Sequence, residues 1–346
     1  MVIDMKMIKK LLIIGLILLM TGCSSVKQYT AYTIYPIGYL LNRIGGNRIE
    51  PISIQTRSLV QVANIVENYD EILEDSSVLF HIGGLEPYMD LYEDRISELG
   101  IDLNVGDLSV LNCLYEYKRY TPIIVDGKAT YIEGPYYEGD VFDEIDTYDL
   151  DPYIWLSPGA MYCMAKDVYE YLSSNYVEQS SYFQENYQAL ADELIALDAS
   201  YQALASRLVK ENKTIKFVAM TGSFGCWQKD FGFQTYPVSL SRYGVIPNQE
   251  QLEIIKAKII NDGVTYIAYE PNMTEEMALV FGQLEEELGL KRVTLYNISS
   301  LTNTQIESGK DYLSLMYENL SILENMAVST APNTMPVPEV EPETED

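Results

Sequence analysis

The chain of 346 residues contains a single histidine, His81. A Ser-His-Asp or Cys-His catalytic arrangement would have to use that one residue, and no serine-rich stretch lies beside it in the sequence. A zinc site built from several imidazoles is excluded as well. Paired carboxylates are abundant and remain as a catalytic alternative. We nevertheless expect a protein that is not an enzyme.

Cysteine is scarce. Cys23 follows an N-terminal apolar run, which leaves Cys113, Cys163 and Cys226 for the rest of the chain. An odd number excludes a fully paired disulfide framework, and spacings of tens of residues match no zinc-ligand pattern. We expect the three to be buried small apolar residues. One disulfide remains open, and the sequence does not say which pair would form it.

Positive charge is also in short supply. Only 23 lysines and arginines stand against 51 acidic residues, which gives a formal net charge of −28. Such a surface repels nucleic acid and anionic membranes and attracts cations. Both a solvated extracytoplasmic surface and a cation-gathering surface agree with this charge, and the first is favoured. An apolar content of 47% is ordinary for a globular protein, and the length suffices for two domains.

The N-terminus has the layout of a bacterial lipoprotein signal. Three lysines precede an apolar run over residues 11–20, and Thr21-Gly22 leads into Cys23. The run is short for a membrane-spanning helix, although an uncleaved anchor is the alternative. We predict that residues 1–22 are removed and that Cys23 carries the lipid anchor. The mature protein would then lie on the extracytoplasmic face of the cell membrane.

Strand-like and helix-like stretches alternate along the chain, which predicts an α/β protein with mostly parallel sheets. The expected strands are residues 30–35, 48–54, 78–82, 101–105, 215–220, 235–238, 265–269 and 292–296. The expected helices, apart from a long central one, begin near Pro36 and cover residues 60–73, 248–261, 275–288 and 310–325. We predict two lobes, over residues 23–180 and 213–328. Residues 329–346, rich in proline and acid, form an expected disordered tail.

The two lobes are joined by the clearest predicted helix. Apolar residues recur at steps of three and four from Tyr187 to Leu208, forming one seam. A helix over residues 183–210 would be roughly 42 Å long. We therefore predict a linking helix within residues 181–212 that runs the height of a two-lobed protein. A coiled-coil partner for this seam is the alternative.

An acidic segment precedes the most informative motif of the chain. Residues 133–151 carry eight carboxylates and no lysine or arginine, interleaved with glycine, proline and tyrosine. This composition predicts a loop. A solvated loop is the favoured interpretation, and a loop that gathers cations is the other.

The motif is Asp151-Pro152-Tyr153-Ile154-Trp155-Leu156-Ser157-Pro158. It resembles the D-P-H-x-W-L-(D/S)-P signature of the zinc- and manganese-binding proteins that serve ABC transporters. Further segments resemble the same family in the same order: Gly45–Glu50, His81–Asp90, Phe224-Gly225, Tyr266–Pro271 and Tyr312–Leu320. The resemblance covers residues 29–326. It implies a two-lobed α/β solute-binding protein with a long backbone helix.

The resemblance also implies where metal ligands would lie, at three histidines and a late acidic residue. The corresponding positions in this chain are Val62, Tyr153, Thr221 and Asn297. Valine has no donor atom, threonine and asparagine are weak neutral donors, and a phenol must ionise from a pKa near 10 to coordinate well. We therefore expect no zinc or manganese at the family positions. Glu270, in the family's E-P motif, and His81 are expected to be structural.

The implied function is that of an ABC importer's binding component, which captures cargo and docks on a permease in the membrane. The four cleft positions fit a small polar organic ligand. A divalent cation held by oxygens of the acidic loop is the second possibility, with weaker and less selective binding. The competing hypothesis is a degenerate scaffold that acts as a protein-interaction or surface-adhesion lipoprotein. Neither hypothesis involves nucleic acid.

The signal layout generates a first prediction. Replacing Cys23 by alanine removes the thiol that would receive the lipid, so the Cys23→Ala protein is expected in the soluble fraction or unprocessed at its full size. Membrane fractionation and electrophoretic migration measure both. If the variant fractionates and migrates like the wild type, Cys23 is not the anchor.

Overall fold

A computed structural model describes residues 29–107, 114–125 and 128–329, and its first lobe contains a four-stranded parallel sheet. The strands are β1 (Tyr29–Tyr32), β2 (Pro51–Ser53), β3 (Ser76–His81) and β4 (Asp102–Asn104), in the order β2-β1-β3-β4. Central β3 is buried on both faces, as expected for a parallel strand covered by helices. The first crossover is α2 (Tyr35–Gly45), which has Pro36 in its first turn, where a missing N–H costs nothing.

The second lobe repeats this plan. Its strands β8 (Lys216–Ala219), β9 (Gln234–Pro237), β10 (Tyr266–Tyr269) and β11 (Lys291–Thr294) form a parallel sheet in the order β11-β10-β8-β9. Helices α8 (Gln249–Asn261) and α9 (Glu275–Leu288) are capped by the side chains of Asn248 and Thr274. The predicted α/β class, with two lobes and mostly parallel sheets, is confirmed.

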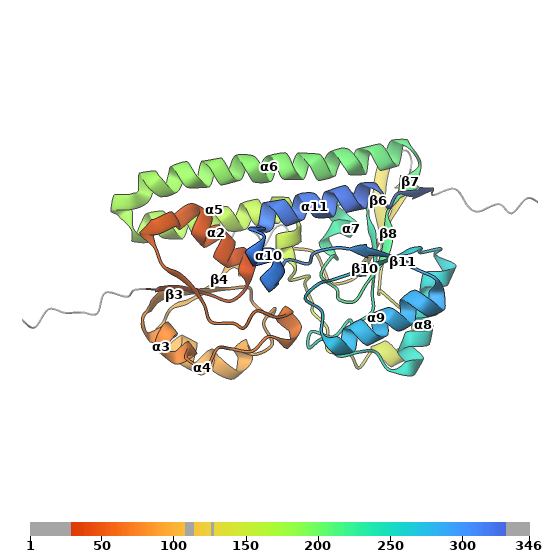
Figure 1. Cartoon of the computed structure of the whole chain (residues 1–346), viewed down its shortest axis with the longest axis horizontal. Coiled ribbons are helices and arrows are strands. Elements are labelled where there is room, and N and C mark those ends of the chain that lie inside the picture. Colours follow the sequence, from red (N-terminus) through yellow and green to blue (C-terminus); the bar gives the residue numbers. More distant parts are fainter. Residues whose placement is uncertain (1–28, 108–113, 126–127, 330–346) are drawn as a thin grey trace, which may run out of the picture.

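The long helix is also confirmed, as α6 (Ser180–Lys210), about 46 Å long. Its seam is buried from Leu190 to Leu208. On the first lobe it packs against α2 and α5 (Pro158–Asn175), and on the second against α7 (Cys226–Phe231) and α11 (Tyr312–Glu324). The Tyr201 hydroxyl donates to the Met316 carbonyl of α11 at 2.8 Å. Figure 1 shows α6 running along one side of both lobes, so its seam lies against this chain and not against a coiled-coil partner.

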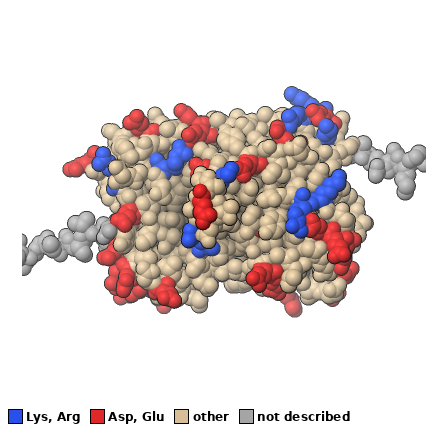
Figure 2. Space-filling view, in the orientation of Figure 1, with Lys and Arg blue, Asp and Glu red and all other residues tan. Residues whose placement is uncertain are grey.

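The remaining elements are short, except for α4 in the first lobe. They are α3 (Tyr69–Glu74), α4 (Met89–Leu99), α10 (Asn303–Glu307), β7 (Lys213–Thr214), β12 (Val328–Ser329), and the 3-10 turns η1 (Gly46–Arg48), η2 (Val60–Val62), η3 (Val105–Asp107), η5 (Asp140–Phe142), η6 (Ile154–Leu156) and η7 (Val177–Gln179). Figure 2 shows acidic side chains along the edge of each lobe that lies farthest from α6.

The helix expected over residues 60–73 is wrong. Only η2 and α3 are helical there. Between them the chain forms a β-bridge from Ile65 to Gln55 and then a turn at residues 67–68. The reason is tertiary pairing: Val66 N donates to the Ile54 carbonyl, and Thr56 N donates to the Asn64 carbonyl. These bonds engage the backbone that a continuous helix would need.

A hairpin was missed. Strands β5 (Arg119–Val125) and β6 (Lys128–Gly134) pair antiparallel, and the sequence between them is Asp126-Gly127, a strong hairpin signal. The hairpin packs on the second lobe, although it comes from the first half of the chain. Gln234 Nε2 donates to the Tyr120 carbonyl at 2.9 Å, and the Tyr131 hydroxyl donates to the Lys229 carbonyl at 2.7 Å. The predicted boundary at residue 180 divides the chain by sequence position, but the β5–β6 hairpin, which comes before that boundary, lies on the second lobe.

Several predictions concern residues outside the described ranges: the signal at residues 1–22, Cys23, Cys113 and the tail after Ser329. Cys163 and Cys226 are not disulfide-bonded to each other. None of the helices in the described part of the chain is long and apolar enough to cross a membrane.

The seam of α6 generates a second prediction. Leu197 is fully buried, so Leu197→Ala is expected to lower the free energy of unfolding by roughly 2–5 kcal/mol. Ile195 lies on the same helix with 56% of its surface exposed. The matched Ile195→Ala control is expected to change stability by no more than about 0.5 kcal/mol. Urea unfolding measures both, and equal losses would show that the seam does not stabilise the joint between the lobes.

Candidate functional site

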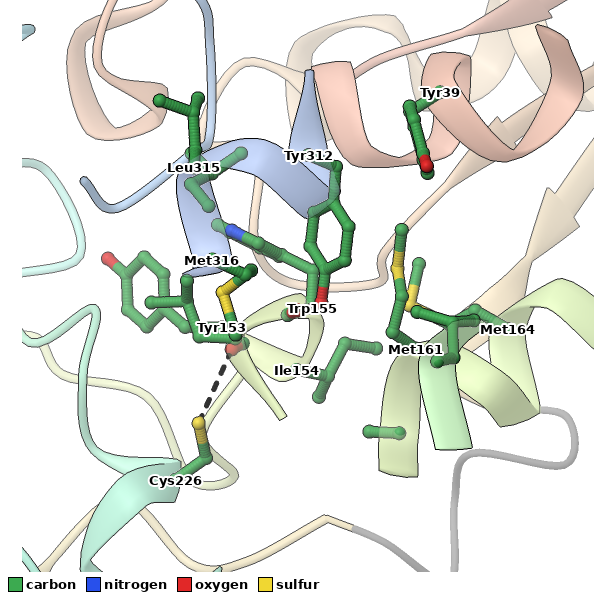
Figure 3. Packing of buried hydrophobic residues seen from close by; sticks show 14 of the residues in the cluster. Tyr39, Tyr153, Ile154, Trp155, Met161, Met164, Cys226, Tyr312, Leu315 and Met316 are labelled. Carbon is green, nitrogen blue, oxygen red and sulfur yellow. Dashed lines mark hydrogen bonds between the residues drawn. The ribbon is translucent and has the colours of Figure 1, made fainter. Parts of the chain in front are cut away.

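The segment from Asp151 to Pro158 lies at the junction of the two lobes. Trp155 is fully buried, and its indole N–H donates to the Asn297 carbonyl of the second lobe at 2.7 Å. Its own carbonyl accepts from the Tyr312 hydroxyl at 2.6 Å. Figure 3 shows Tyr312 beside Trp155, with Tyr153 close by. Ser157 then caps α5, accepting from Ala160 N, and Pro158 occupies its first turn.

Tyr153, at the position of a family ligand, is 1% exposed and already has a hydrogen-bond partner. Its hydroxyl accepts from the side-chain amide of Gln61. Its ring makes edge contacts with Tyr148 and Trp155 at centroid distances of 5.8 and 5.5 Å. Burial raises the pKa of the Tyr153 phenol well above its usual value, and the nearby Tyr148 and Tyr117 add to this. The neutral phenol is a poor metal ligand.

Tyr153 belongs to a group of four tyrosines whose rings contact one another. We call Tyr117, Tyr136, Tyr148 and Tyr153 the tyrosine cluster. The ring of Tyr117 contacts those of Tyr136 and Tyr148 at 5.4 and 5.6 Å. The Tyr117 hydroxyl lies so close to Gly222 that a β-carbon there would collide with it. Aromatic side chains therefore pack up to the backbone beside Thr221.

Thr221 and Asn297 meet on one buried carboxylate, that of Glu270. Glu270 Oε1 accepts from the backbone N–H groups of Met220 and Thr221 at 3.0 and 3.2 Å. Its Oε2 accepts from Thr221 Oγ1 at 2.9 Å and Asn297 Nδ2 at 2.7 Å. Burial raises the Glu270 pKa, and these bonds oppose the shift. Glu270 thus ties three strand ends together, which is the structural role expected for it.

Asn297 is held on its other side as well. It exchanges two side-chain hydrogen bonds with Asn272, at 2.8 and 2.9 Å, and its Oδ1 also accepts from Ser299 N. The next residue, Ile298, has φ of 56°, a left-handed conformation that is strained for a β-branched side chain. The surrounding bonds hold this strained turn in place.

Val62 is the exception among the four positions, since 38% of its surface is exposed. It ends η2, directly after Gln61, and a β-carbon on Gly244 of the second lobe would lie 3.5 Å from Val62 Cγ1. The four predicted positions therefore form two pairs. Val62 lies beside the Gln61 that binds Tyr153, and Thr221 and Asn297 share Glu270. Trp155 connects the pairs by contacting Tyr153 and the Asn297 carbonyl.

The donor set does not fit zinc. Within residues 29–107, 114–125 and 128–329, no three His, Cys, Asp or Glu side chains are grouped to hold a metal ion. This includes the acidic loop over residues 133–151, where Glu133 pairs with Lys118 and Lys229. His81 ends β3, and its Nε2 lies 2.6 Å from Asp102 Oδ1 of the neighbouring strand.

Two of the groups that matter here were not predicted from the sequence. Gln61 is the partner of Tyr153, and Tyr117 fills the space beside Gly222. Nothing in the sequence marks Gln61, which lies 92 residues before Tyr153. The high tyrosine content, 29 residues, was the available signal for the tyrosine cluster.

The sequence is similar to those of known zinc-uptake proteins. The family described as zinc-uptake complex component A, periplasmic (ZnuA), matches residues 31–326. The zinc-binding protein AdcA of Streptococcus pyogenes is 28% identical over 185 residues, covering 52% of this chain and 34% of AdcA. ZnuA of the high-affinity zinc uptake system of Bacillus subtilis is 24% identical, over 52% of this chain and 54% of that protein. The aligned part thus spans about a third of AdcA.

Solved structures share the fold. The periplasmic zinc-binding protein TroA of Treponema pallidum superposes with a TM-score of 0.66 at 14% identity, covering 87% of this chain and 99% of TroA. A mutant of the laminin-binding adhesin Lmb of Streptococcus agalactiae gives 0.67 at 16% identity, over 86% and 99% of the two chains. At these identities the likeness concerns the fold alone.

Asp151 generates a third prediction. It is 5% exposed and its Oδ1 accepts from Tyr153 N at 3.0 Å. Burial raises its pKa to about 7, Tyr153 N opposes this, and the Asp230 charge adds to it. Between the unfolded pKa of about 3.9 and about 7, the folded protein binds more protons than the unfolded chain. The contribution of Asp151 to the free energy of unfolding is therefore largest at low pH and is lost as the pH rises to about 7.

We expect the free energy of unfolding of Asp151→Asn to fall less between pH 5 and pH 8 than that of the wild type. The difference between the two proteins is at most about 1.4 kcal/mol for each unit by which folding raises the Asp151 pKa. Asp149→Asn, at an exposed position of the same loop, serves as the control and is expected to follow the wild type. Urea unfolding at both pH values measures the slopes. Parallel slopes for Asp151→Asn and the wild type would mean that Asp151 titrates at its ordinary pKa.

Proposed function

The chain belongs to the family of ZnuA, the periplasmic component A of zinc-uptake complexes, and we propose that it is the extracytoplasmic solute-binding lipoprotein of an ABC importer whose cargo is not zinc at the family position. Members of this family are binding proteins of uptake systems and not enzymes. The steps are capture of a solute between the lobes, lobe closure and docking on a membrane permease. Anchoring through Cys23 keeps the protein near that permease.

One observation carries the exclusion of zinc: the Tyr153 hydroxyl already accepts a hydrogen bond from Gln61 in a buried, neutral environment. Ionising this phenol would cost free energy, because burial raises its pKa well above 10. The other three positions offer no imidazole. Thr221 and Asn297 are committed to Glu270, and Val62 has no donor atom. Manganese, which prefers oxygen ligands, would meet the same neutral groups.

The same residues support a small polar organic cargo. Gln61 Oε1 is buried and has no hydrogen-bond partner among the described residues. A buried unsatisfied acceptor costs about 1–3 kcal/mol, and a cargo with an N–H or O–H donor would relieve that cost. Because Tyr153, Thr221 and Asn297 are each 1% exposed, the lobes would have to separate before cargo enters. Val62, partly exposed beside Gly244, marks the side of entry.

A scaffold that binds another protein is the second candidate. The filled space around Tyr153 favours it, since a closed, hydrogen-bonded junction needs no cargo. Structural neighbours include the laminin-binding adhesin Lmb of S. agalactiae and the laminin-binding protein Lbp of S. pyogenes. A native mass spectrum of the mature protein separates the two functions. A co-purified organic molecule supports cargo binding, whereas the bare polypeptide mass supports the scaffold.

Zinc titration generates a fourth prediction. The wild type is expected to show no tight zinc binding by calorimetry. The combined variant Val62→His, Tyr153→His, Thr221→His and Asn297→Asp is expected to gain it, because complete ligand sets reach roughly 10–16 kcal/mol of apparent binding free energy. The four changes share one ion and should act non-additively.

The control places three histidines apart from one another, by Leu91→His, Val209→His and Leu279→His, at positions that are 68–81% exposed. It should bind zinc only weakly. Nanomolar binding by the wild type would overturn the proposal and direct attention to residues 133–151. If neither the wild type nor the combined variant binds zinc, the junction has been remodelled beyond its ligands, which favours the organic cargo or the scaffold.

A further inference from the structure

A cavity of about 400 Å³ lies between the β5–β6 hairpin and helix α8 of the second lobe. Its walls include Arg119 and Glu133 from the hairpin, Tyr136 and Tyr137 from the loop after it, and Lys258 from α8. The volume suits a small organic molecule. The cavity contains none of the four family positions, and its wall shares one residue, Tyr136, with the tyrosine cluster.

Arg119 is the central group of the cavity wall. It is 7% exposed, and its guanidinium lies over the Tyr236 ring at 4.2 Å. Its three hydrogen-bond contacts within the described part of the chain are all long: 3.2 Å to Gln234 Oε1, 3.4 Å to the Thr235 carbonyl and 3.5 Å to Asp262 Oδ2. A guanidinium has five N–H donors, so this buried cation retains unused capacity for an oxyanion.

The wall contains two cations, Arg119 and Lys258, and two acids, Glu133 and Glu138, and further charges lie directly behind it. Lys258 Nζ lies 3.0 Å from Asp262 Oδ2, and Lys216 Nζ donates to the Asp262 carbonyl at 2.7 Å. Arg119 and Lys258 thus share the Asp262 carboxylate, and Lys216 lies at the backbone carbonyl of the same residue. Burial lowers the pKa of Lys216; Asp262 opposes this shift, and Arg119 and Lys258 add to it. An anion in the cavity would relieve the repulsion among these three cations.

The acidic residues nearby do not supply that anion. Glu133 is held by Lys118 at 2.9 Å and Lys229 at 3.4 Å, and Glu138 is exposed to solvent. In a chain of net charge −28, a cavity wall with as many cations as acids differs from the average surface. Random placement of surface lysines does not account for a buried arginine at its centre.

We propose that this cavity binds a small organic oxyanion, through a carboxylate or phosphate group placed against Arg119 and Lys258. The planar guanidinium presents paired N–H donors that match either group, and Lys258 contributes a point charge. Tyr136, Tyr137 and Ile254 provide the surface for the organic part of the ligand. The site goes beyond the proposed function, because it uses none of the four family positions and does not require transport.

The test is calorimetric titration of the full mature chain at low salt with citrate, glycerol 3-phosphate, inorganic phosphate and neutral glycerol. We expect saturable binding of citrate or glycerol 3-phosphate and none of glycerol. The stronger of the two identifies the oxyanion as carboxylate or phosphate. Binding should weaken as salt rises, because the contact is between charges. Absence of binding by both organic anions overturns the proposal. Equal affinity for inorganic phosphate and glycerol 3-phosphate overturns the part played by the organic group.

Variants separate the cavity from general electrostatics. Lys258→Gln is expected to weaken binding about tenfold or more, the effect of losing one charged hydrogen bond. Lys166→Gln is the matched control: Lys166 is similarly exposed and also pairs with an acid four residues later on a helix. Equal weakening by both variants overturns the site. Ala257→Trp, at an exposed position of the cavity wall, keeps every charge but fills the space and should abolish binding. Unchanged binding in a folded Ala257→Trp protein also overturns it.

Discussion

The structure depends on the burial of Trp155 at the point where the two lobes and the last helix meet. Its indole N–H and its carbonyl each have a partner from a different element, the Asn297 carbonyl and the Tyr312 hydroxyl. Trp227 adds a third bond, donating to the Leu156 carbonyl at 2.8 Å. A buried polar group without a partner is costly, so these bonds fix the segment in one position. This segment places Tyr153 and, through the Trp155 indole, is bonded to Asn297, so it connects two of the four family positions.

At the positions that the motif resemblance assigns to metal ligands, this chain has Val62, Tyr153, Thr221 and Asn297, none of which is a histidine or a carboxylate. Tyr153 is bonded to Gln61, while Thr221 and Asn297 stabilise Glu270. Among the described residues, the side-chain polar atoms of Tyr153, Thr221 and Asn297 all have partners, whereas Gln61 Oε1 has none. The junction is therefore held together by hydrogen bonds within the protein.

The sequence predicted the parts of the fold that depend on local pattern. Buried strands such as β3 and β8, and the seam of α6, follow from apolar periodicity alone. It failed over residues 60–73, where pairing with residues 54–56 overrides helical spacing. At the junction, motif likeness located Tyr153, Thr221 and Asn297, but not what they touch. The partners Gln61 and Tyr153 are 92 residues apart, and only the folded chain brings them together.

The hairpin has a consequence for how the chain is divided. From the first sheet the chain passes to the second lobe at β5 and β6, returns to the first in α5, where Tyr171 packs on Phe80 of β3, and crosses again along α6. The first half of the polypeptide contains all four strands of the first sheet, whereas the second lobe takes its strands from both halves. Many contacts therefore join residues distant in sequence, which slows folding and links the two cores into one cooperative unit. A cut at any single connection would leave two incomplete fragments instead of two independent domains.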